Sequence, residues 1–483
     1  MSSSTLLLGI DVGTTRTKVG AFHLDGHLAA AAASDYPLQF NANGAAEQDP
    51  LDWWGATREA IGAVLSQVAA AEIIGVSVGG QGPTMVALDG ALSPVGPALT
   101  WMDRRAATEV GELNVRIGHS LPAHAFVPKV MWLHRHRPEV YASSRWFCQA
   151  WDYVAAQLCG LLSASMSPAI APWDEDTLAA SELDREKFPP QRLMGERIGS
   201  VTPAAAAATG LPEGIPVVGG ISDYYESVIG VDALRPSIAC DTGGTSQSLN
   251  LCWDAALQVQ GAFCLPSFVE GHWYIGGPAS TTGKAFEWWR DQVLESGSDS
   301  ATLLEAAASV SPGSESLLFL PYLSGERTPL WDPQARAVFF GLSLHHTRAH
   351  MTRAVVESVA YVLCHIIERI ETAGGGVHEI HCCGGQAKSD LWSQIKADAT
   401  GKRVIVPEVS DAAMLGAAII AGVGVGAFGD FIIGAAQMVR PRKFLEPDEA
   451  NHERYRSIFS VYRDLYPALR PFYKRTGELV DLL

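Results

Sequence analysis

The sequence predicts an α/β protein made of two similar halves. Strand-like and helix-like segments alternate along both halves, which is typical of sheets covered by helices. One further feature occurs twice, an apolar run that ends in an aspartate and a turn of glycines and hydroxyl residues. Its two copies are LLLGIDVGTTRTKVGAF (6–22) and SIACDTGGTSQSLNL (237–251). A hairpin repeated at matching points of the two halves favours duplication of one domain over a single long sheet.

The composition is that of an ordinary soluble protein. The 483 residues are 47% hydrophobic and 18% charged, and the net charge is −17. A chain of this length can form two or three domains with substantial cores. The negative charge argues against nucleic acid or a membrane as a partner, since both reward basic surfaces. The eight cysteines include no C-x-x-C pair, which favours a reduced, cytoplasmic protein.

In the first half we expect a hairpin over residues 5–33, turning at Asp25–Gly26. A helix with Asp49 as its N-cap candidate follows over residues 49–70. Strands are predicted over residues 72–78 and 215–220. The proline-containing segment 163–177 is typical of a loop.

In the second half the periodicity predicts helices over residues 348–372 and 389–400, with strands over residues 379–385 and 403–408. The uncharged segment 412–428 approaches the length of a membrane span. Because aspartates flank it and its second half is rich in glycine, we expect a buried helix and the turn after it. A break near residues 230–238 separates the two halves.

The repeated hairpins indicate phosphate binding. A turn of glycine and threonine presents backbone N–H groups and hydroxyls to phosphate oxygens. Asp11 and Asp241 precede the two turns, and a carboxylate next to a phosphate is repulsive unless a cation such as Mg²⁺ binds both. Either hairpin alone also fits an ordinary turn. Together they predict two cradles that hold a triphosphate.

The chain resembles the FGGY carbohydrate kinases, within the superfamily of actin, hexokinase and the heat-shock chaperones. The resemblance extends over essentially the whole chain. It rests on segments that include GIDVGTTRTK (9–18), EQDPLDWW (47–54), TWMDRR (100–105), LPYLSGERTPLWDPQARAVFFGL (320–342) and CCGGQAKSDLWSQIKADATGK (382–402).

This resemblance implies an α/β fold of two ribonuclease-H-like domains of the actin and hexokinase type that flank a deep cleft. Residues 1–233 would form the N-terminal domain, with the sugar site, the first phosphate hairpin and the catalytic aspartate. Residues 234–483 would form the nucleotide-binding domain, with a helical C-terminal tail. ATP and Mg²⁺ are the cofactors that the family implies.

By the resemblance, the catalytic base is Asp223 in GGISDYYES (219–227). A sugar hydroxyl is a poor nucleophile, and a carboxylate within hydrogen-bond distance can accept its proton as the phosphoryl group is transferred. The alternative is that Asp223 caps the helix that follows. Asp11 matches the metal-associated aspartate of the family.

The resemblance also assigns the nucleotide contacts. They are Thr14, Thr15 and Arg16 on the first phosphate loop, Gly244 and Thr245 on the second, Gly325 beside the phosphates, Gly384, Gly385 and Gln386 at the adenosine, and Gly416 in the adenine-side helix. Ordinary strand-to-helix turns are the alternative interpretation of these glycines. The role of Lys18 is left open between a phosphate contact and a strand-edge lysine.

On the sugar side, the resemblance assigns Gln81, Trp101, Asp103 and His124. Gly82 and Pro83 stand where glycerol kinases carry an Arg-Glu pair and xylulokinases typically carry Met-His. Glycerol is therefore disfavoured, and D-xylulose is placed in doubt. The predicted substrate is a ketose such as a xylulose- or ribulose-type pentulose, with a polyol of the erythritol type or another uncommon ketose as the alternative. Asp103 could instead form a local salt bridge with Arg104.

One hypothesis from a different class is an ATP-driven switch, as in actin and the chaperones on the same scaffold. The segments around Asp223, Gly325 and Asp103 favour a sugar kinase. Kinases of the family are often homodimers, but no stretch of this sequence identifies an interface.

Overall fold

The structure is a computed structural model that describes residues 5–41, 44–122, 124–168, 171–244, 246–294 and 299–480. Its contacts divide the chain into two compact units. The first unit is Met1–Asp232 with Asp411–Arg440, and the second is Ala233–Ser410 with Pro441–Leu483. Residues 411–440, which the sequence had placed in the second domain, therefore pack within the first unit.

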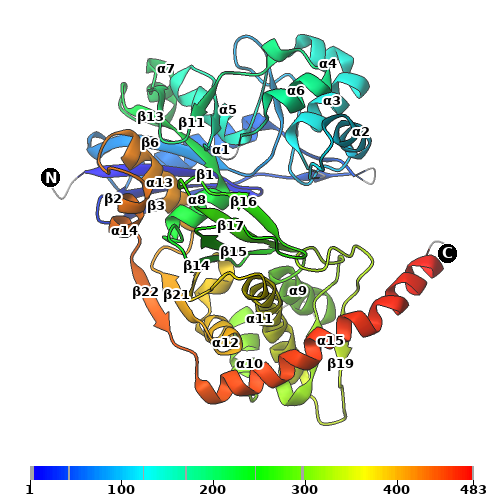
Figure 1. Ribbon diagram of the computed structural model, residues 1–483. Coiled ribbons are helices and arrows are strands. Elements are labelled where there is room, and N and C mark those ends of the chain that lie inside the picture. Colours follow the sequence, from blue (N-terminus) through cyan, green and yellow to red (C-terminus); the bar gives the residue numbers. More distant parts are fainter. Residues whose placement is uncertain are drawn as a thin grey trace. The chain divides into compact units, whose positions relative to one another are not determined.

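A six-stranded sheet forms the centre of the first unit, in the order β12-β13-β6-β1-β2-β3 (Figure 1). The strands are β1 (Leu6–Val12), β2 (Arg16–His23), β3 (Leu28–Asp35), β6 (Ile73–Gly80), β12 (Arg197–Ser200) and β13 (Pro216–Ser222). β6 lies between β1 and β13 and is parallel to both, and the other pairings are antiparallel. The predicted hairpin turn at Asp25–Gly26 is confirmed, and Gly26 has a φ of 87°.

Helices cover both faces of this sheet. Leu8 and Ile10 of β1 belong to the core formed with α1 (Pro50–Leu65) and α5 (Ala150–Cys159). Because side chains alternate along a strand, Gly9 and Asp11 point to the other face. There α13 (Ala412–Gly424) comes so close that a Cβ on Gly9 would lie 2.0 Å from the Met414 carbonyl oxygen. Asp11 is therefore directed toward the side of the sheet that α13 covers.

Smaller elements complete the first unit. The strands are β4 (Gln39–Phe40), β5 (Ala46–Gln48), β7 (Val86–Leu88), β8 (Ala98–Leu99), β9 (Trp146–Cys148), β10 (Ala164–Met166) and β11 (Gln191–Leu193). The helices are η1 (Ala70–Glu72), α2 (Ala107–Ile117), α3 (Phe126–His136), α4 (Pro138–Ser143), α6 (Glu175–Ser181), η2 (Arg185–Lys187), α7 (Pro203–Thr209), α8 (Asp223–Gly230) and α14 (Phe431–Met438). The segment 163–177, expected to be a loop, contains β10 and the start of α6, because a three-residue strand is too short to give a periodic pattern.

The sheet of the second unit has the order β16-β17-β15-β14-β20-β21-β22. Its strands are β14 (Ile238–Thr242), β15 (Gln247–Trp253), β16 (Phe263–Pro266), β17 (Trp273–Ala279), β20 (Glu379–Cys383), β21 (Arg403–Pro407) and β22 (Pro441–Leu445). β17-β15-β14-β20-β21 repeats the order and directions of β3-β2-β1-β6-β13. This repeat is what duplication of one domain predicts.

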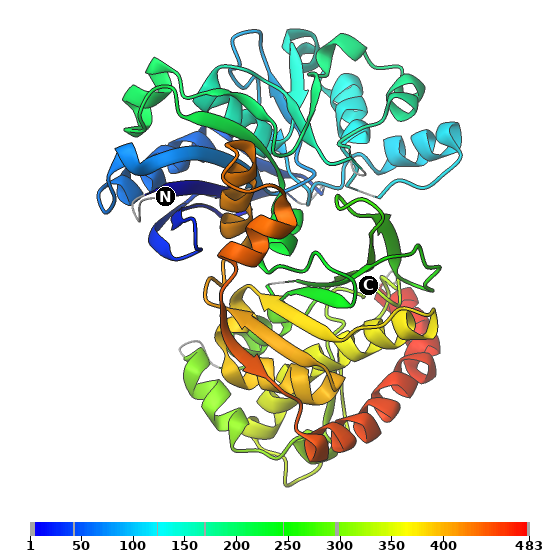
Figure 2. The same cartoon turned by 60° about the vertical axis from the view of Figure 1, so that its left-hand side comes forward.

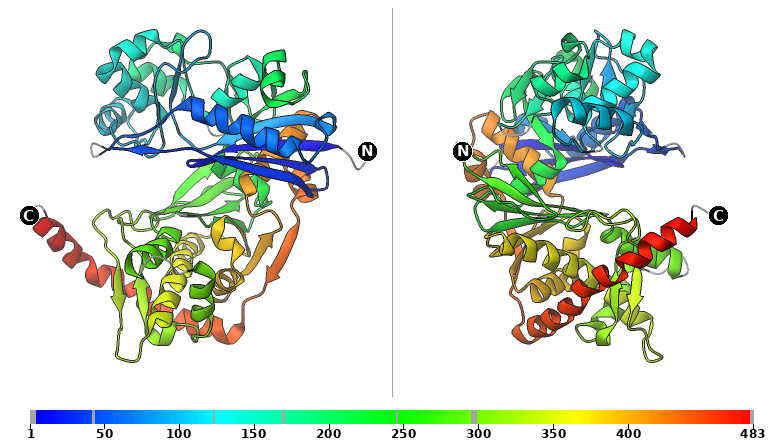
Figure 3. Two further views of the ribbon diagram at one scale, coloured as in Figure 1. Left: turned by 180° about the vertical axis from the view of Figure 1, so that it is seen from behind. Right: turned by 45° about the vertical axis from the view of Figure 1, so that its right-hand side comes forward.

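Long helices pack against the second sheet. Those on the sheet are α11 (Arg348–Thr372), whose bounds are as predicted, and α12 (Asp390–Thr400) (Figure 2). The other elements are α9 (Gly283–Trp288), a π-helical turn (Trp289–Val293), α10 (Ser300–Ala308), η4 (Ser314–Ser316), β18 (Leu318–Leu320), β19 (Val338–Phe340), η5 (Gly385–Lys388) and α15 (Glu449–Val480). Figure 3 shows α15 along the outside of this unit.

Small residues allow α13 to pack closely against α8, as expected for a buried helix. A Cβ on Gly230 of α8 would lie 1.9 Å from the carbonyl oxygen of Ala412, and a Cβ on Gly416 would lie 1.9 Å from that of Glu226. Within the described part of the chain, no helix has the length and apolar character that crossing a membrane requires.

Replacing Gly230 with Ala should therefore lower the free energy of unfolding by about 1–3 kcal/mol, the usual cost of overpacking. Gly62→Ala in α1 is the matched control, since a Cβ there meets no atom within 4 Å and alanine favours the helix by up to about 1 kcal/mol. Urea unfolding of both variants measures the difference. Equal stabilities would contradict the close contact of α8 with α13.

Candidate active site

Residues 13–15 form the first phosphate turn, and hydrogen bonds to its backbone carbonyl groups hold it in place. The carbonyl of Gly13 accepts hydrogen bonds from the Tyr36 hydroxyl at 2.6 Å and from Gln81 Nε2 at 3.2 Å. That of Thr14 accepts one from Gln48 Nε2 at 2.8 Å. Thr15 is exposed. Gln48 belongs to the EQDP segment but had no predicted role, because only the folded chain brings it under the turn.

Arg16 begins β2 next to this turn. Its Nε lies 2.8 Å from the Asp35 carboxylate, and both side chains are about half exposed or more. The structure therefore shows Arg16 in a surface ion pair, and its contact with phosphate stays a prediction.

Asp11 is buried at the end of β1 with one oxygen left without a partner. Burial raises the pKa of Asp11 to about 6, the charge of Lys18 lowers it, and Asp411 raises it again. Lys18 Nζ is 3.9 Å from Asp11 Oδ2 but donates a 2.7 Å hydrogen bond to Asp411 Oδ1. Among the described residues, none donates a hydrogen bond to the buried Oδ1 of Asp11. A buried carboxylate oxygen of this kind fits a hard cation such as Mg²⁺.

Asp223 is the first residue of α8, directly after β13. Ser222 pairs with Gly80 of β6, and Asp11 of β1 pairs with Gly79. The two aspartates therefore come from neighbouring positions at the carboxyl-terminal ends of the parallel strands β1, β6 and β13. Asp223 keeps some accessible surface. Burial, and next the negative charge of Asp11, raise the pKa of Asp223 to about 7.

The helix-capping alternative for Asp223 is partly realised. Asp223 Oδ1 accepts a 2.7 Å hydrogen bond from the backbone N–H of Tyr224. This contact orients the carboxylate and favours its ionised form. The same side chain can therefore contact the helix start and still present its other oxygen to a substrate.

Gln81 and Trp101 are brought together at the first phosphate turn. The Trp101 indole N–H donates to Thr14 Oγ1 at 3.1 Å, and Gln81 Nε2 donates to Gln48 Oε1 at 2.7 Å. Gln81 Oε1 is buried, and no described residue hydrogen bonds to it. Two residues assigned to the sugar are thus bonded to the turn assigned to phosphate.

Asp103 forms hydrogen bonds with other residues of the first unit. Its carboxylate accepts from the Arg105 guanidinium at 2.7 Å and from the Ala46 N–H at 3.0 Å, and Arg105 also bonds to Glu47 at 2.6 Å. The local salt bridge left open by the sequence thus exists with Arg105 and not with Arg104. His124 lies partly buried in the turn before α3.

Lys129 links the two loops of the sugar side. Its Nζ donates to the carbonyls of Pro83 at 2.7 Å and of Thr100 at 2.8 Å. Burial lowers the pKa of Lys129 to about 7, while the charge of Asp103 raises it and that of Arg104 lowers it. The sequence predicted no role for Lys129, because any residue type can supply the backbone carbonyls that it contacts.

In the second unit, the second phosphate turn packs against two other glycine-containing segments. Gln386 N–H donates to the Gly243 carbonyl at 3.0 Å. A Cβ on Gly283 would lie 2.1 Å from the Gly244 oxygen, and a Cβ on Gly384 would lie 2.6 Å from the Gly243 oxygen. Thr245 lies outside the described residues.

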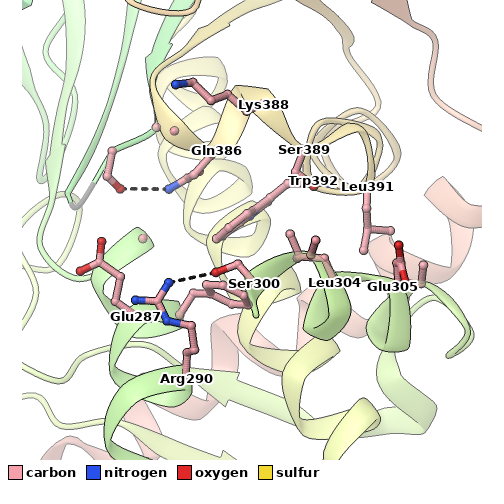
Figure 4. A pocket seen from close by; sticks show the side chains of 17 residues that line it. Glu287, Arg290, Ser300, Leu304, Glu305, Gln386, Lys388, Ser389, Leu391 and Trp392 are labelled. Carbon is pink, nitrogen blue, oxygen red and sulfur yellow. Dashed lines mark hydrogen bonds between the residues drawn. The ribbon is translucent and has the colours of Figure 1, made fainter. Parts of the chain in front are cut away.

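A pocket of about 720 Å³ opens beside this turn (Figure 4). Gly244, Gly385 and Gln386, three of the residues assigned to the nucleotide, line it. Its apolar walls are Phe286, Leu304, Leu391 and Trp392. Arg290 donates a 2.9 Å hydrogen bond to Ser300 Oγ across one side. The volume is in the range of small-ligand sites, about 300–1,000 Å³.

Three glycines assigned to the nucleotide, Gly325, Gly384 and Gly416, are not among the described residues that line the pocket. At Gly325 a Cβ would lie 2.7 Å from Pro333 Cα. Gly416 belongs to the first unit and packs against Glu226 of α8. Its small size is explained by helix packing, and its contact with adenine stays a prediction.

Comparison with known proteins identifies the family of the chain. Residues 6–230 match the FGGY family of carbohydrate kinases, N-terminal domain, and residues 242–425 match the C-terminal domain of the same family. The gluconokinase of Bacillus subtilis (strain 168) is 28% identical over 504 residues, covering 98% of each chain. The xylulose kinase of the same organism is 29% identical over 482 residues, covering 95% of this chain and 96% of the relative.

A solved structure has the same fold. The xylulose kinase from Rhodospirillum rubrum superposes with a TM-score of 0.84 at 27% identity, covering 97% of this chain and 100% of that chain. The sequence-based expectation of the fold is thereby confirmed.

Asp223 should cost the protein stability at alkaline pH. A carboxyl group whose folded pKa is about 7, against an ordinary 3.8, binds more protons when folded, so stability falls as the pH rises between these values. We expect Asp223→Asn to stabilise the protein by about 2–3 kcal/mol more at pH 8 than at pH 5. Urea unfolding at both pH values measures this.

The control for this prediction is Asp464→Asn, because that side chain is 75% exposed. It should show little difference between the two pH values. If Asp223→Asn behaved like this control, the raised pKa of Asp223 would be contradicted.

Proposed function

Because the chain belongs to the FGGY family of carbohydrate kinases, we propose that it transfers the γ-phosphoryl group of ATP to a hydroxyl of a ketose. A xylulose- or ribulose-type pentulose is the substrate class that we favour. The observation that carries the proposal is Asp223, a partly accessible carboxylate with a raised pKa at the same sheet edge as the first phosphate turn. Kinases of this family use ATP.

In this mechanism Asp223 is the general base. A pKa of about 7 suits this role, because the group is largely ionised just above neutrality and still basic enough to accept the hydroxyl proton. The proton moves to Asp223 as the sugar oxygen bonds to the γ-phosphorus and the bond to the leaving ADP breaks. The Tyr224 N–H holds the carboxylate in one orientation during this step.

The glycine–threonine turn of each unit would offer its own backbone N–H groups to a phosphate group. Asp11 would hold Mg²⁺ through its unpartnered oxygen. When bound, this ion would neutralise charge on the phosphates. Asp241 does not fit such an ion, because Gln247 and Lys396 engage both of its oxygens at 2.6 Å.

On the sugar side, Gln81 and Trp101 would contact the substrate while they hold the first phosphate turn. Sugar binding and phosphate alignment would then depend on the same hydrogen bonds. Asp103, bonded to Arg105, would shape the site together with His124, and Lys129 would keep the Pro83 and Thr100 loops together. This connection favours a kinase over an ATPase that acts without a sugar.

A coupled ADP-release assay with ketopentoses, ketohexoses, polyols and gluconate tests the proposed function. Gluconate is included because curated relatives are gluconokinases. We expect ATP turnover to depend on a ketose, and most strongly on a pentulose. Turnover that is the same with and without every sugar would instead indicate an ATP-driven switch, and turnover limited to polyols would indicate the alternative substrate class.

Replacing Asp223 with Asn should lower turnover by about 10²–10⁴-fold, the usual contribution of a positioned base. Binding of ADP should be unchanged, which calorimetry can measure. Near-normal turnover in this variant would show that another group accepts the proton.

A further inference from the structure

A buried ion pair lies next to the second phosphate turn. Lys396 Nζ of α12 is 2.6 Å from Asp241 Oδ2 of β14, and their side chains are 1% and 0% exposed. Removing two charges from water is costly, and such a pair is often less stabilising than apolar residues of the same size. Its presence at this position therefore calls for a role other than stability.

The pair connects the elements that end at the nucleotide pocket. Asp241 lies two residues before Gly243 of the turn, and its Oδ1 accepts a 2.6 Å hydrogen bond from Gln247 Nε2 at the start of β15. Its Oδ2 also accepts a 3.4 Å hydrogen bond from Sγ of Cys382. Cys382 belongs to β20 and lies two residues before Gly384. Both ends of the turn and the strand beside it are thus attached to one carboxylate.

Lys396 extends this connection to a wall of the pocket. Trp392 lines the pocket and lies four residues earlier in α12, on the same face of the helix. Its ring contacts Phe286 edge-on, with centroids 5.4 Å apart. The Lys396–Asp241 bond therefore joins the helix that carries the aromatic wall to the strand that carries the turn.

The equivalent position of the first unit is built differently. Asp11 is the next-to-last residue of β1 as Asp241 is of β14, but Lys18 Nζ is 3.9 Å from Asp11 and bonds to Asp411 instead. Among the described residues, none hydrogen bonds to Oδ1 of Asp11, whereas both oxygens of Asp241 accept hydrogen bonds. The second aspartate is therefore a structural anchor of its turn and is not available to a cation.

We propose that Lys396 is a positioning residue for the nucleotide. By neutralising Asp241 it holds the second phosphate turn at a fixed distance from α12, so that the phosphates and the base are bound at the same time. This inference rests on the proposed nucleotide role of the pocket. It adds a residue, outside the pocket lining, on which that role depends.

The test compares Lys396→Met with the double variant Asp241→Asn/Lys396→Met. The single change leaves a buried charge unpaired and should lower the unfolding midpoint. The double change removes both charges and should restore most of that midpoint. The Kd for ADP, measured by calorimetry, should stay raised about tenfold in the double variant, the loss expected for one charge-assisted hydrogen bond. The KM for the sugar should not change.

A double variant that regained both the midpoint and the wild-type Kd would overturn the proposal, because the pair would then be only structural. The matched control is the buried pair Arg353–Glu357 of α11, 2.7 Å apart, which bonds to Gly313, Tyr455 and the Ala307 carbonyl of α10 rather than to β14, β15 or β20. Arg353→Met/Glu357→Gln should leave the Kd for ADP unchanged. The same increase in this control would also overturn the proposal.

ADP binding decides this inference, and formation of a phosphorylated sugar decides the proposed function. If the wild type forms product while the Lys396 variants bind ADP normally, only the inference fails. If the wild type binds ADP and forms no product from any sugar, only the proposed function fails.

Discussion

A buried carboxylate at the end of a central strand is the constraint on which both units depend. Asp11 and Asp241 are the next-to-last residues of β1 and β14, at equivalent positions of two sheets that share the order of their five matching strands. A buried charge must be compensated by a counter-charge, a ligand or a proton. The second unit supplies Lys396 and is complete without a ligand. The first unit leaves an oxygen of Asp11 open, and this difference separates a structural carboxylate from one that can take part in chemistry.

Asp11 and Asp223 of the first unit are both incompletely compensated acids. Asp11 raises the pKa of Asp223, and burial raises both. When both carboxylates are ionised, as catalysis by a base requires, their burial lowers the free energy of unfolding. Favourable contacts elsewhere in the unit must therefore compensate for this loss. The packing of α8 against α13 is one source of that support, because α8 begins with Asp223 and its backbone touches Gly416. Stability elsewhere in the unit thus permits a strained electrostatic site.

The sequence could predict what local patterns record. The 3.6-residue period gave α11 its bounds, and the glycine–threonine turns marked both hairpins. Partners that only the fold brings together could not be predicted in this way. Lys18 and Asp411 are 393 residues apart, and Asp241 and Lys396 are 155 apart. Asp103 bonds to Arg105 because the side chain of Arg105 turns back toward it, whereas the adjacent Arg104 is exposed, which the order of the residues alone does not specify.

Glycines show why a motif alone leaves the site incomplete. A glycine is required where a neighbouring backbone comes close, and also where a ligand comes close. The sequence alone cannot distinguish these two reasons for a glycine. At Gly416 a Cβ would lie 1.9 Å from the backbone of Glu226, so helix packing explains the residue without a nucleotide. At Gly385 a Cβ would meet no atom within 4 Å, and the residue lines the pocket. Among the described residues, none comes close enough to position 385 to require a glycine there, so helix packing accounts for Gly416 but not for Gly385, whose contact with a nucleotide stays a prediction.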